Sequence, residues 1–141
     1  MIDYRGSVAG IQPDQLQGFF EGWPKHPTPE RHLALLQNSD YVVIAWDDET
    51  QRVVGFINAV SDRVLSAYIP LLEVLPAYRK RGIGGELVRR MLERLSHLYM
   101  VDLTCDADLQ PFYERLGMQR YTSMMMRRFD RQDGQPAAAG D

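Results

Sequence analysis

Two apolar, β-branched runs in the first half of the chain flank a short polar segment. The runs cover residues 41–46 and 53–60, and residues 47–51 between them are polar throughout. Runs of this length and composition, joined by a few polar residues, are typical of two strands in a hairpin. Similar apolar runs predict four more strands, over residues 2–5, 67–75, 100–105 and 118–129.

The clearest helical pattern covers residues 83–99. Its apolar residues recur every three or four positions, and the pairs Glu86/Arg90 and Arg89/Glu93 lie at i,i+4 spacing on the outer face. The apolar face comprises Ile83, Leu87, Val88, Met91, Leu92, Leu95, Leu98 and Tyr99. Three shorter helices are predicted: one from Pro13 to Trp23, one from an N-cap at Thr28 to Asn38, and one from an N-cap at Asp108 to Gly117.

Length and composition indicate one folded domain. The chain has 141 residues, of which 45% are hydrophobic and 25% charged, so it has enough apolar residues for a core. We expect this domain to cover residues 1–129. Residues 130–141 contain glycine, proline and three alanines and are expected to form a disordered tail.

Several classes of protein are excluded by charge and residue usage. A formal net charge of −3 argues against a nucleic-acid-binding role. The N-terminus lacks the apolar region of a signal peptide, and no apolar run approaches the ~18 residues of a membrane helix, so we expect a cytoplasmic protein without membrane contact. The single cysteine, Cys105, rules out a disulfide framework, and no residue spacing indicates a metal site.

The most informative segment is the glycine-rich loop, residues 79–85, which leads from an apolar strand into the long helix. It reads Arg79, Lys80, Arg81, Gly82, Ile83, Gly84 and Gly85. We expect the backbone of residues 82–85 to contribute most to binding a phosphate, and Arg79 and Arg81 are the better candidates for a side-chain contact. The first N–H groups of a helix lack backbone partners and bind anions, and glycines let a bulky anion approach. A P-loop is excluded because Gly84 is followed by Gly85-Glu86, and a dinucleotide fingerprint because its third glycine is Leu87.

The pattern Arg-x-x-Gly-x-Gly at residues 79–84 resembles the coenzyme A pyrophosphate loop of the GNAT superfamily of acyl-CoA N-acyltransferases. A second motif, Phe112-Tyr113 followed by Gly117-Met118, is similar to the Phe-Tyr-x-x-x-Gly-Phe element that this family places near the thioester. The order of predicted elements over residues 1–129 is also that of the family. The resemblance implies an α/β GNAT-like fold, with a mixed central sheet of about six strands flanked by about four helices.

The resemblance also implies the reaction and its co-substrate. Acetyl-CoA would donate an acetyl group to a primary amine of a small molecule or peptide by direct attack, without a metal. The pantetheine arm would lie along the strand 67–75, with an N–H near Val74 or Leu75 polarising the thioester carbonyl. Asp106 stands where the family often has an asparagine, and is the remaining candidate contact to coenzyme A.

Tyr113 is the candidate general acid. A phenol with a pKa of about 10 can protonate a thiolate of about 8.5 only if it is held beside it. The position of Tyr113 between Leu109 and Leu116 also fits a core residue.

Glu73 is the candidate base. Strand alternation places it on the side of Ile69, Leu71 and Leu75, where burial would raise its pKa toward neutrality. The alternative is a solvated carboxylate, or one paired with an arginine.

Phe20 and Trp23 lie in the region that walls the acceptor cleft in the family, although Phe20 fits the core equally well. An acyl carrier role for Cys105 is disfavoured because no histidine is near it in sequence. Two other functions remain open: a non-catalytic acyl-CoA sensor, and a protein-interaction module without coenzyme A dependence. A monomer or a homodimer is expected.

Overall fold

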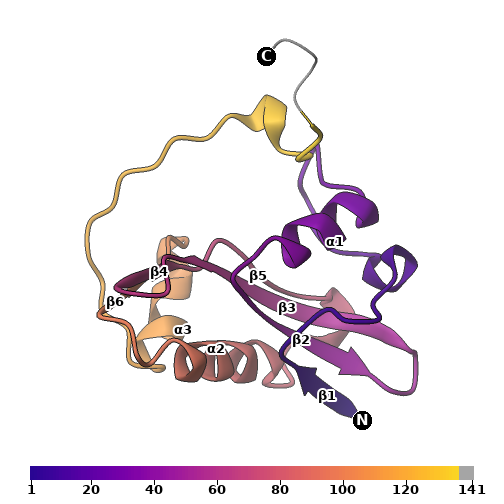
Figure 1. The fold of residues 1–141 in the computed structure, drawn as a ribbon, viewed down its shortest axis with the longest axis horizontal. Helices are drawn as coiled ribbons and strands as arrows, with labels where there is room; N and C mark the ends of the chain where they lie inside the picture. Colours follow the sequence, from indigo (N-terminus) through magenta and orange to yellow (C-terminus); the bar gives the residue numbers. More distant parts are fainter. Residues whose placement is uncertain (137–141) are drawn as a thin grey trace.

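A mixed sheet forms the centre of the molecule (Figure 1). The structure is a computed structural model that describes residues 1–136. The strands are β1 (Ile2–Arg5), β2 (Tyr41–Asp47), β3 (Arg52–Ser61), β4 (Ser66–Tyr68), β5 (Leu72–Val74) and β6 (Met100–Asp102). Their order is β1-β2-β3-β4-β6, with β5 also paired to β3, and only the β4–β6 pair is parallel. The predicted fold class, with its six-stranded mixed sheet, is confirmed.

The hairpin of β2 and β3 is the most buried part of the sheet. Nearly every residue of the two strands is buried, so their side chains are covered on both faces. Figure 1 shows the reason: α1 (Pro29–Gln37) lies over one face and α2 (Ile83–Arg94) over the other. A strand covered on both faces needs a continuous apolar run, which is the pattern found here.

Helix α1 begins where its capping sequence predicts. The Thr28 hydroxyl accepts a hydrogen bond from the Arg31 N–H at 3.2 Å, and Pro29 occupies the first turn. This residue pattern satisfies one free N–H at the helix start and preorganises the backbone there.

Helix α2 carries the predicted apolar face but ends earlier than predicted. Its buried residues are Ile83, Leu87, Val88 and Met91. Leu95 and Leu98 are also buried, but they follow the last helical residue, and Tyr99 is 83% exposed. Apolar spacing does not distinguish a last helical turn from the tight turn that leads into β6.

Two other helix predictions are corrected. The segment from Pro13 to Trp23 forms only a 3₁₀ turn, Pro13–Leu16, because Gly18, Phe20 and Gly22 adopt positive φ angles that no helix allows. The helix near the second motif is α3 (Gln110–Glu114), and the 3₁₀ turn Ala107–Leu109 precedes it. Asp106, and not the predicted Asp108, is the N-cap of that turn. Residues 1–136 thus contain three α-helices and four 3₁₀ turns instead of about four helices.

The predicted strand 67–75 is divided into β4 and β5 at Pro70. Proline has no N–H for a sheet ladder, so the strand breaks there. The first half continues toward β6, where the Ile69 N–H donates to the Asp102 carbonyl at 2.9 Å. The second half stays on β3, and the edge of β5 that faces away from β3 is left open.

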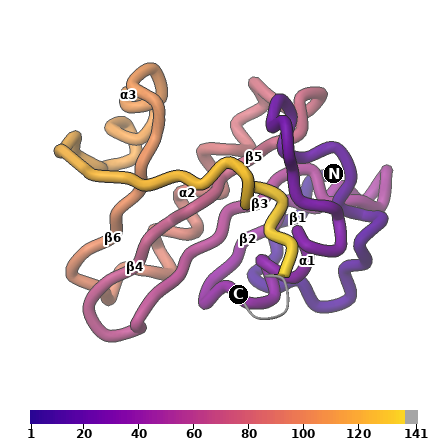
Figure 2. The backbone as a smooth tube through the Cα atoms, turned by 90° about the horizontal axis from the view of Figure 1, so that it is seen from above, coloured from indigo at the N-terminus to yellow at the C-terminus, as the bar shows by residue number. Residues whose placement is uncertain are grey.

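The last predicted strand does not join the sheet. Residues 118–129, called the arm below, leave α3 and run past the sheet to the neighbourhood of α1 (Figures 1 and 2). The strand prediction there is wrong in this structure, because these residues form no ladder. The segment predicted as a disordered tail follows with a 3₁₀ turn, Phe129–Arg131, and contacts to Lys25 and Arg31; its residues 137–141 lie outside the described part of the chain.

Close packing of α2 on the sheet requires a glycine in β3. A Cβ atom at Gly55 would lie 3.1 Å from Leu87 Cδ1 and 3.3 Å from both Ile83 Cγ2 and the Glu73 carbonyl oxygen. The first turns of α2 therefore pack directly on the backbone where β3 meets β5.

Within residues 1–136 no helix is long and apolar enough to cross a bilayer.

A buried histidine lies inside an aromatic cluster between α1 and the sheet. His32 is 1% exposed, and its ring centroid lies 4.5 Å from that of Phe56, 4.9 Å from Phe20 and 5.3 Å from Phe19. Both ring nitrogens lack a hydrogen-bond partner among the described residues. Burial lowers the pKa of His32 to about 4.

We expect His32 to make the fold sensitive to acid. Between pH 6.5 and 4 the unfolded state binds a proton that the folded state does not, so stability falls as the pH falls through this window. From pH 7 to pH 5 the loss from this group is on the order of 2 kcal/mol. Denaturant unfolding of the parent and of His32→Leu at both pH values measures it, because the other titrating groups are common to both proteins. Equal losses in the two proteins would contradict the assignment.

Candidate active site

The glycine-rich loop enters α2 through a left-handed glycine. Gly82 adopts φ 81° and ψ 5° as the N-cap, a conformation that glycine accepts without strain. The first backbone bond of the helix runs from the Glu86 N–H to the Gly82 carbonyl at 3.1 Å. The N–H groups of residues 83–85 therefore have no helical acceptor and point to where an anion would bind.

A hydrogen bond to the hairpin anchors the turn that precedes the loop. The Tyr78 hydroxyl, in the 3₁₀ turn Pro76–Tyr78, donates to Asp47 Oδ2 at 2.5 Å. This bond is the main cause of the lowered pKa of Asp47, and a bond from the Glu49 N–H adds to it. The pairing was not visible in the sequence, because residues 47 and 78 lie far apart in it.

The three basic side chains of the loop differ in what they contact. Arg79 donates to the Val74 carbonyl at 3.2 Å and lies 3.5 Å from the Glu21 carboxylate. Arg81 donates to the Ala77 carbonyl, also at 3.2 Å. Lys80 is exposed, and its side chain makes no hydrogen bond or ion pair to residues 1–136. Glu21, which partly neutralises Arg79, was missed because nothing in its sequence context marks it.

The register of β5 distinguishes the two N–H groups that are candidates to donate a hydrogen bond to the thioester carbonyl. The Leu75 N–H donates to the Val54 carbonyl at 2.9 Å, so it is already paired within the sheet. In an antiparallel ladder, successive N–H groups point to opposite edges, so the Val74 N–H faces the open edge of β5. Val74 also lies beside the loop, since its Cγ2 is 3.8 Å from where a Gly84 Cβ would be.

Glu73 is half-buried on β5 and has a backbone partner. Its Oε1 accepts a hydrogen bond from the Phe20 N–H at 2.8 Å. Burial raises the pKa of Glu73, while this hydrogen bond and the charge of Arg79 lower it. Glu73 therefore also holds Phe20, which has a positive φ of 64°, in place.

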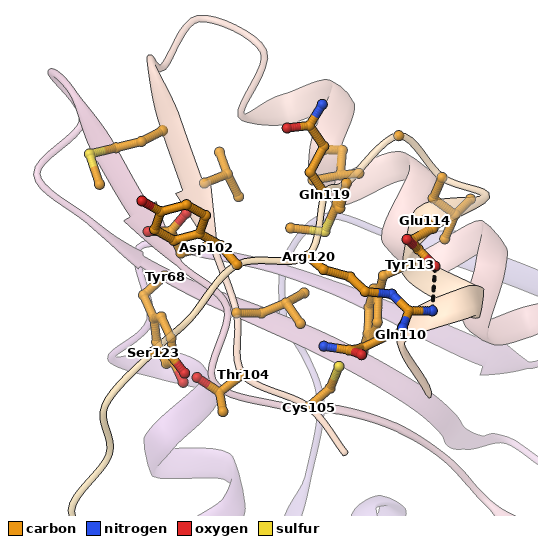
Figure 3. Close-up of a pocket in the computed structure, with 18 of the residues that line it drawn as sticks. Tyr68, Asp102, Thr104, Cys105, Gln110, Tyr113, Glu114, Gln119, Arg120 and Ser123 are labelled. Carbon is orange, nitrogen blue, oxygen red and sulfur yellow. Dashed lines mark hydrogen bonds and ion pairs between the residues drawn. The ribbon is translucent and has the colours of Figure 1, made fainter. Parts of the chain in front are cut away.

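Tyr113 lies on α3 at the wall of a large open cavity (Figure 3). Its ring packs edge to face on Phe112, with centroids 4.9 Å apart. Burial raises the pKa of Tyr113 to about 12, and the neighbouring Cys105 adds to the effect. The pKa of Cys105 is raised too, by burial and then by Asp106 and Asp108, so its thiol stays protonated and is a poor nucleophile.

Phe112 connects the Tyr113 side of the site to the loop. Its Cζ lies 3.8 Å from where a Cβ of Gly84 would be, so α3 packs directly against the first turn of α2. The structure thus places the loop, Val74 and Glu73 together. Tyr113 follows Phe112, the residue that contacts the loop, in the sequence. Glu73 and the loop do not line the cavity that contains Tyr113.

The remaining candidates are less favourably placed. Phe20 is 3% exposed and packs in the aromatic cluster, which supports its core interpretation. Trp23 is only half-buried, and its ring centroid lies 4.8 Å from that of Phe20. Asp106 is exposed at the start of the 3₁₀ turn before α3, and its side chain makes no capping hydrogen bond.

The family model and the solved structure that match this chain are both of acetyltransferases. Residues 8–118 match the family model described as Acetyltransferase (GNAT) family. A solved structure from Deinococcus radiodurans R1, a candidate acetyltransferase, is 51% identical, covers 96% of this chain and 94% of its own, and superposes with a TM-score of 0.92.

Two curated relatives are more distant. The GCN5-related N-acetyltransferase 1, chloroplastic, of Arabidopsis thaliana is 29% identical over 80% of this chain, and the uncharacterized N-acetyltransferase ycf52 of Porphyra purpurea is 28% identical over 68% of it. The matched stretches span only 59% and 57% of those proteins' own lengths. Because one relative is named chloroplastic, the expected cytoplasmic location stays a prediction.

Proposed function

The chain belongs to the GNAT acetyltransferase family, and from this we propose that it transfers an acetyl group from acetyl-CoA to a primary amine of a small molecule or peptide. The observation that carries the proposal is the start of α2, where three unpaired N–H groups follow the left-handed Gly82 beside the open edge of β5. That arrangement suits an acyl donor with a pyrophosphate at one end and an extended amide-containing arm at the other.

The loop would hold the pyrophosphate of coenzyme A. The N–H groups of residues 83–85 can donate hydrogen bonds to an anion without moving, and the α2 dipole favours the anion. Lys80 is free to reach a phosphate oxygen, whereas Arg79 and Arg81 would first leave the carbonyls they now contact. We therefore assign the main side-chain contact to Lys80, instead of to Arg79 or Arg81, which the sequence favours.

The open edge of β5 would position the thioester. An extended pantetheine arm can pair with this edge as a further strand does, and the Val74 N–H would donate to the thioester carbonyl. The same donor strengthens its bond as negative charge develops on that oxygen, which lowers the barrier to attack.

Glu73 would act as the general base and Tyr113 as the general acid. Glu73 removes a proton from the ammonium, directly or through water, and the amine nitrogen then attacks the carbonyl carbon. As the tetrahedral intermediate collapses, the carbon–sulfur bond breaks and the amide forms. Tyr113 gives its proton to the sulfur and regains one from the amide nitrogen, which loses its second proton in this step. Tyr113 has a pKa above that of the thiol, so it is protonated at neutral pH and stabilises the leaving sulfur as a hydrogen-bond donor.

Acetyl-CoA binding is expected to depend on Lys80. Lys80→Glu puts a like charge beside the phosphates, so we expect Kd for acetyl-CoA to rise about tenfold or more. Isothermal titration calorimetry measures it, with Arg63→Glu, an exposed position in the β3–β4 turn, as the matched control. Absence of binding by the parent would reject both the transferase and the sensor, and would favour an interaction module.

The Glu73→Gln variant tests whether Glu73 acts as a base while it keeps the hydrogen bond from the Phe20 N–H. The glutamine oxygen can still accept the bond from the Phe20 N–H, so we expect normal unfolding and normal acetyl-CoA binding. Turnover should fall about 100-fold and lose its decline at acid pH, because in the parent protonation of the carboxylate removes the base. Thiol release with a panel of primary amines, including lysine peptides, measures it across pH. Full turnover at every pH would remove Glu73 as the base.

Tyr113→Phe tests the donor to the leaving sulfur. The ring and its packing on Phe112 are kept, so acetyl-CoA affinity should not change, while kcat should fall about 100-fold. The same thiol-release assay, combined with calorimetry, gives both quantities. Unchanged kcat would assign Tyr113 to packing alone, and binding without turnover by the parent with every amine would favour a sensor.

A further inference from the structure

A buried carboxylate lies at the end of β2, far in the sequence from the glycine-rich loop. Asp47 is 5% exposed, and no cationic group of residues 1–136 lies within ion-pair distance of it. A buried carboxylate without a cation needs hydrogen bonds to offset the loss of water. Asp47 accepts one from the Tyr78 hydroxyl at 2.5 Å and one from the Glu49 N–H at 2.9 Å.

The two hydrogen bonds have different consequences. The bond from the Glu49 N–H closes the turn of the hairpin, as an aspartate at a turn commonly does. The bond from Tyr78 joins residues 31 positions apart, and the turn does not require it. Because its acceptor is ionised and the two oxygens are so close, this bond belongs to the strong, charge-assisted class. The hairpin therefore holds the turn Pro76–Tyr78 from outside.

The ring of Tyr78 makes a second contact, farther along the loop. The guanidinium carbon of Arg81 lies 5.0 Å from the ring centroid, a distance typical of a cation–π contact. Arg81 directly precedes Gly82, the N-cap of α2. Tyr78 thus fixes the turn before the loop through its hydroxyl and the residue before the helix cap through its ring.

The backbone between these two contacts needs to be held. Lys80 has a φ of 64° and Gly82 a φ of 81°. Glycine adopts this left-handed conformation freely, but a residue with a Cβ atom loses free energy in it. Such a conformation persists where surrounding contacts impose it. Arg79, bonded to the Val74 carbonyl, supplies such a contact from β5, and Tyr78 supplies one from the hairpin.

We propose that Asp47 and Tyr78 are positioning residues of the acetyl-CoA site: their hydrogen bond fixes the loop, and so the direction of the N–H groups of residues 83–85. The pair acts through the loop and not by contact with a phosphate. This inference rests on the proposed function. The alternative is that the bond stabilises the fold and leaves the loop unchanged.

The affinity of the folded protein for acetyl-CoA distinguishes the two. Tyr78→Phe removes the hydroxyl and keeps the ring beside Arg81, so we expect Kd to rise about five- to tenfold in calorimetric titration. Tyr41→Phe is the matched control and should leave Kd unchanged. Tyr41 lies at the other end of β2, its ring centroid is 5.2 Å from the Arg94 guanidinium carbon, and its hydroxyl makes no hydrogen bond to residues 1–136.

Denaturant unfolding of the same proteins completes this test. An unchanged Kd in Tyr78→Phe, with or without a loss of stability, would overturn the positioning role and leave the proposed function intact. Absence of acetyl-CoA binding by the parent would instead reject the proposed function, and this inference with it.

A double-mutant cycle tests whether the two residues act as one unit. Asp47→Ala should raise Kd about as much as Tyr78→Phe does, and the double variant no further, because all three lack the same bond. Increases that multiply would show independent effects and would overturn the pairing. The Tyr78→Phe result stands by itself if Asp47→Ala does not fold.

Amide hydrogen exchange tests the anchoring without acetyl-CoA. The Tyr78 N–H donates to the Leu75 carbonyl at 2.9 Å, and the Arg79 N–H donates to the Pro76 carbonyl at 3.3 Å. In Tyr78→Phe these two amides should exchange at least about threefold faster than in the parent, because the turn opens more often. The Asn58 amide in β3 serves as internal reference, and Tyr41→Phe should match the parent at the two turn amides. Equal exchange of the turn amides in Tyr78→Phe and the parent would overturn the proposal.

Discussion

The close packing of α2 on the β2–β3 hairpin is the constraint on which the other parts of the structure depend. Gly55 lets the first turns of α2 approach the backbone of β3, and Ile83, Leu87, Val88 and Met91 are buried in that contact. A helix that packs this closely has its N-terminus fixed against the end of β5. The position of the free N–H groups at the start of α2 therefore depends on core packing as well as on the loop sequence.

Whereas the packing of α2 closes one face of the sheet, the break at Pro70 leaves one edge of β5 unpaired. β4 continues to β6 and β5 remains on β3, so the Val74 N–H faces outward while the Leu75 N–H is used within the sheet. Phe112, packed at the first turn of α2, brings α3 to the same place. The two adjacent N–H groups of residues 74 and 75 therefore face opposite edges of β5.

Glu73 and His32 show how the aromatic cluster connects fold and chemistry. Glu73 accepts the N–H of Phe20, whose ring packs on His32, so the candidate base is held by the same cluster that excludes water from the histidine. Glu73 and His32 therefore share this environment. The arm is the one long described segment that takes no part in such packing.

Local patterns in the sequence were sufficient for the hairpin, the capped α1, the buried face of α2 and the two family motifs, because each depends on residues a few positions apart. They also brought Tyr113, Glu73 and the loop into consideration. Long-range pairing decided the rest: which N–H of β5 is free, that Phe20 is buried, that residues 13–23 turn instead of forming a helix, and that the arm leaves the sheet. A period of two or of 3.6 residues indicates which side of an element is buried, but it does not state what will cover that side. That depends on neighbours distant in the sequence.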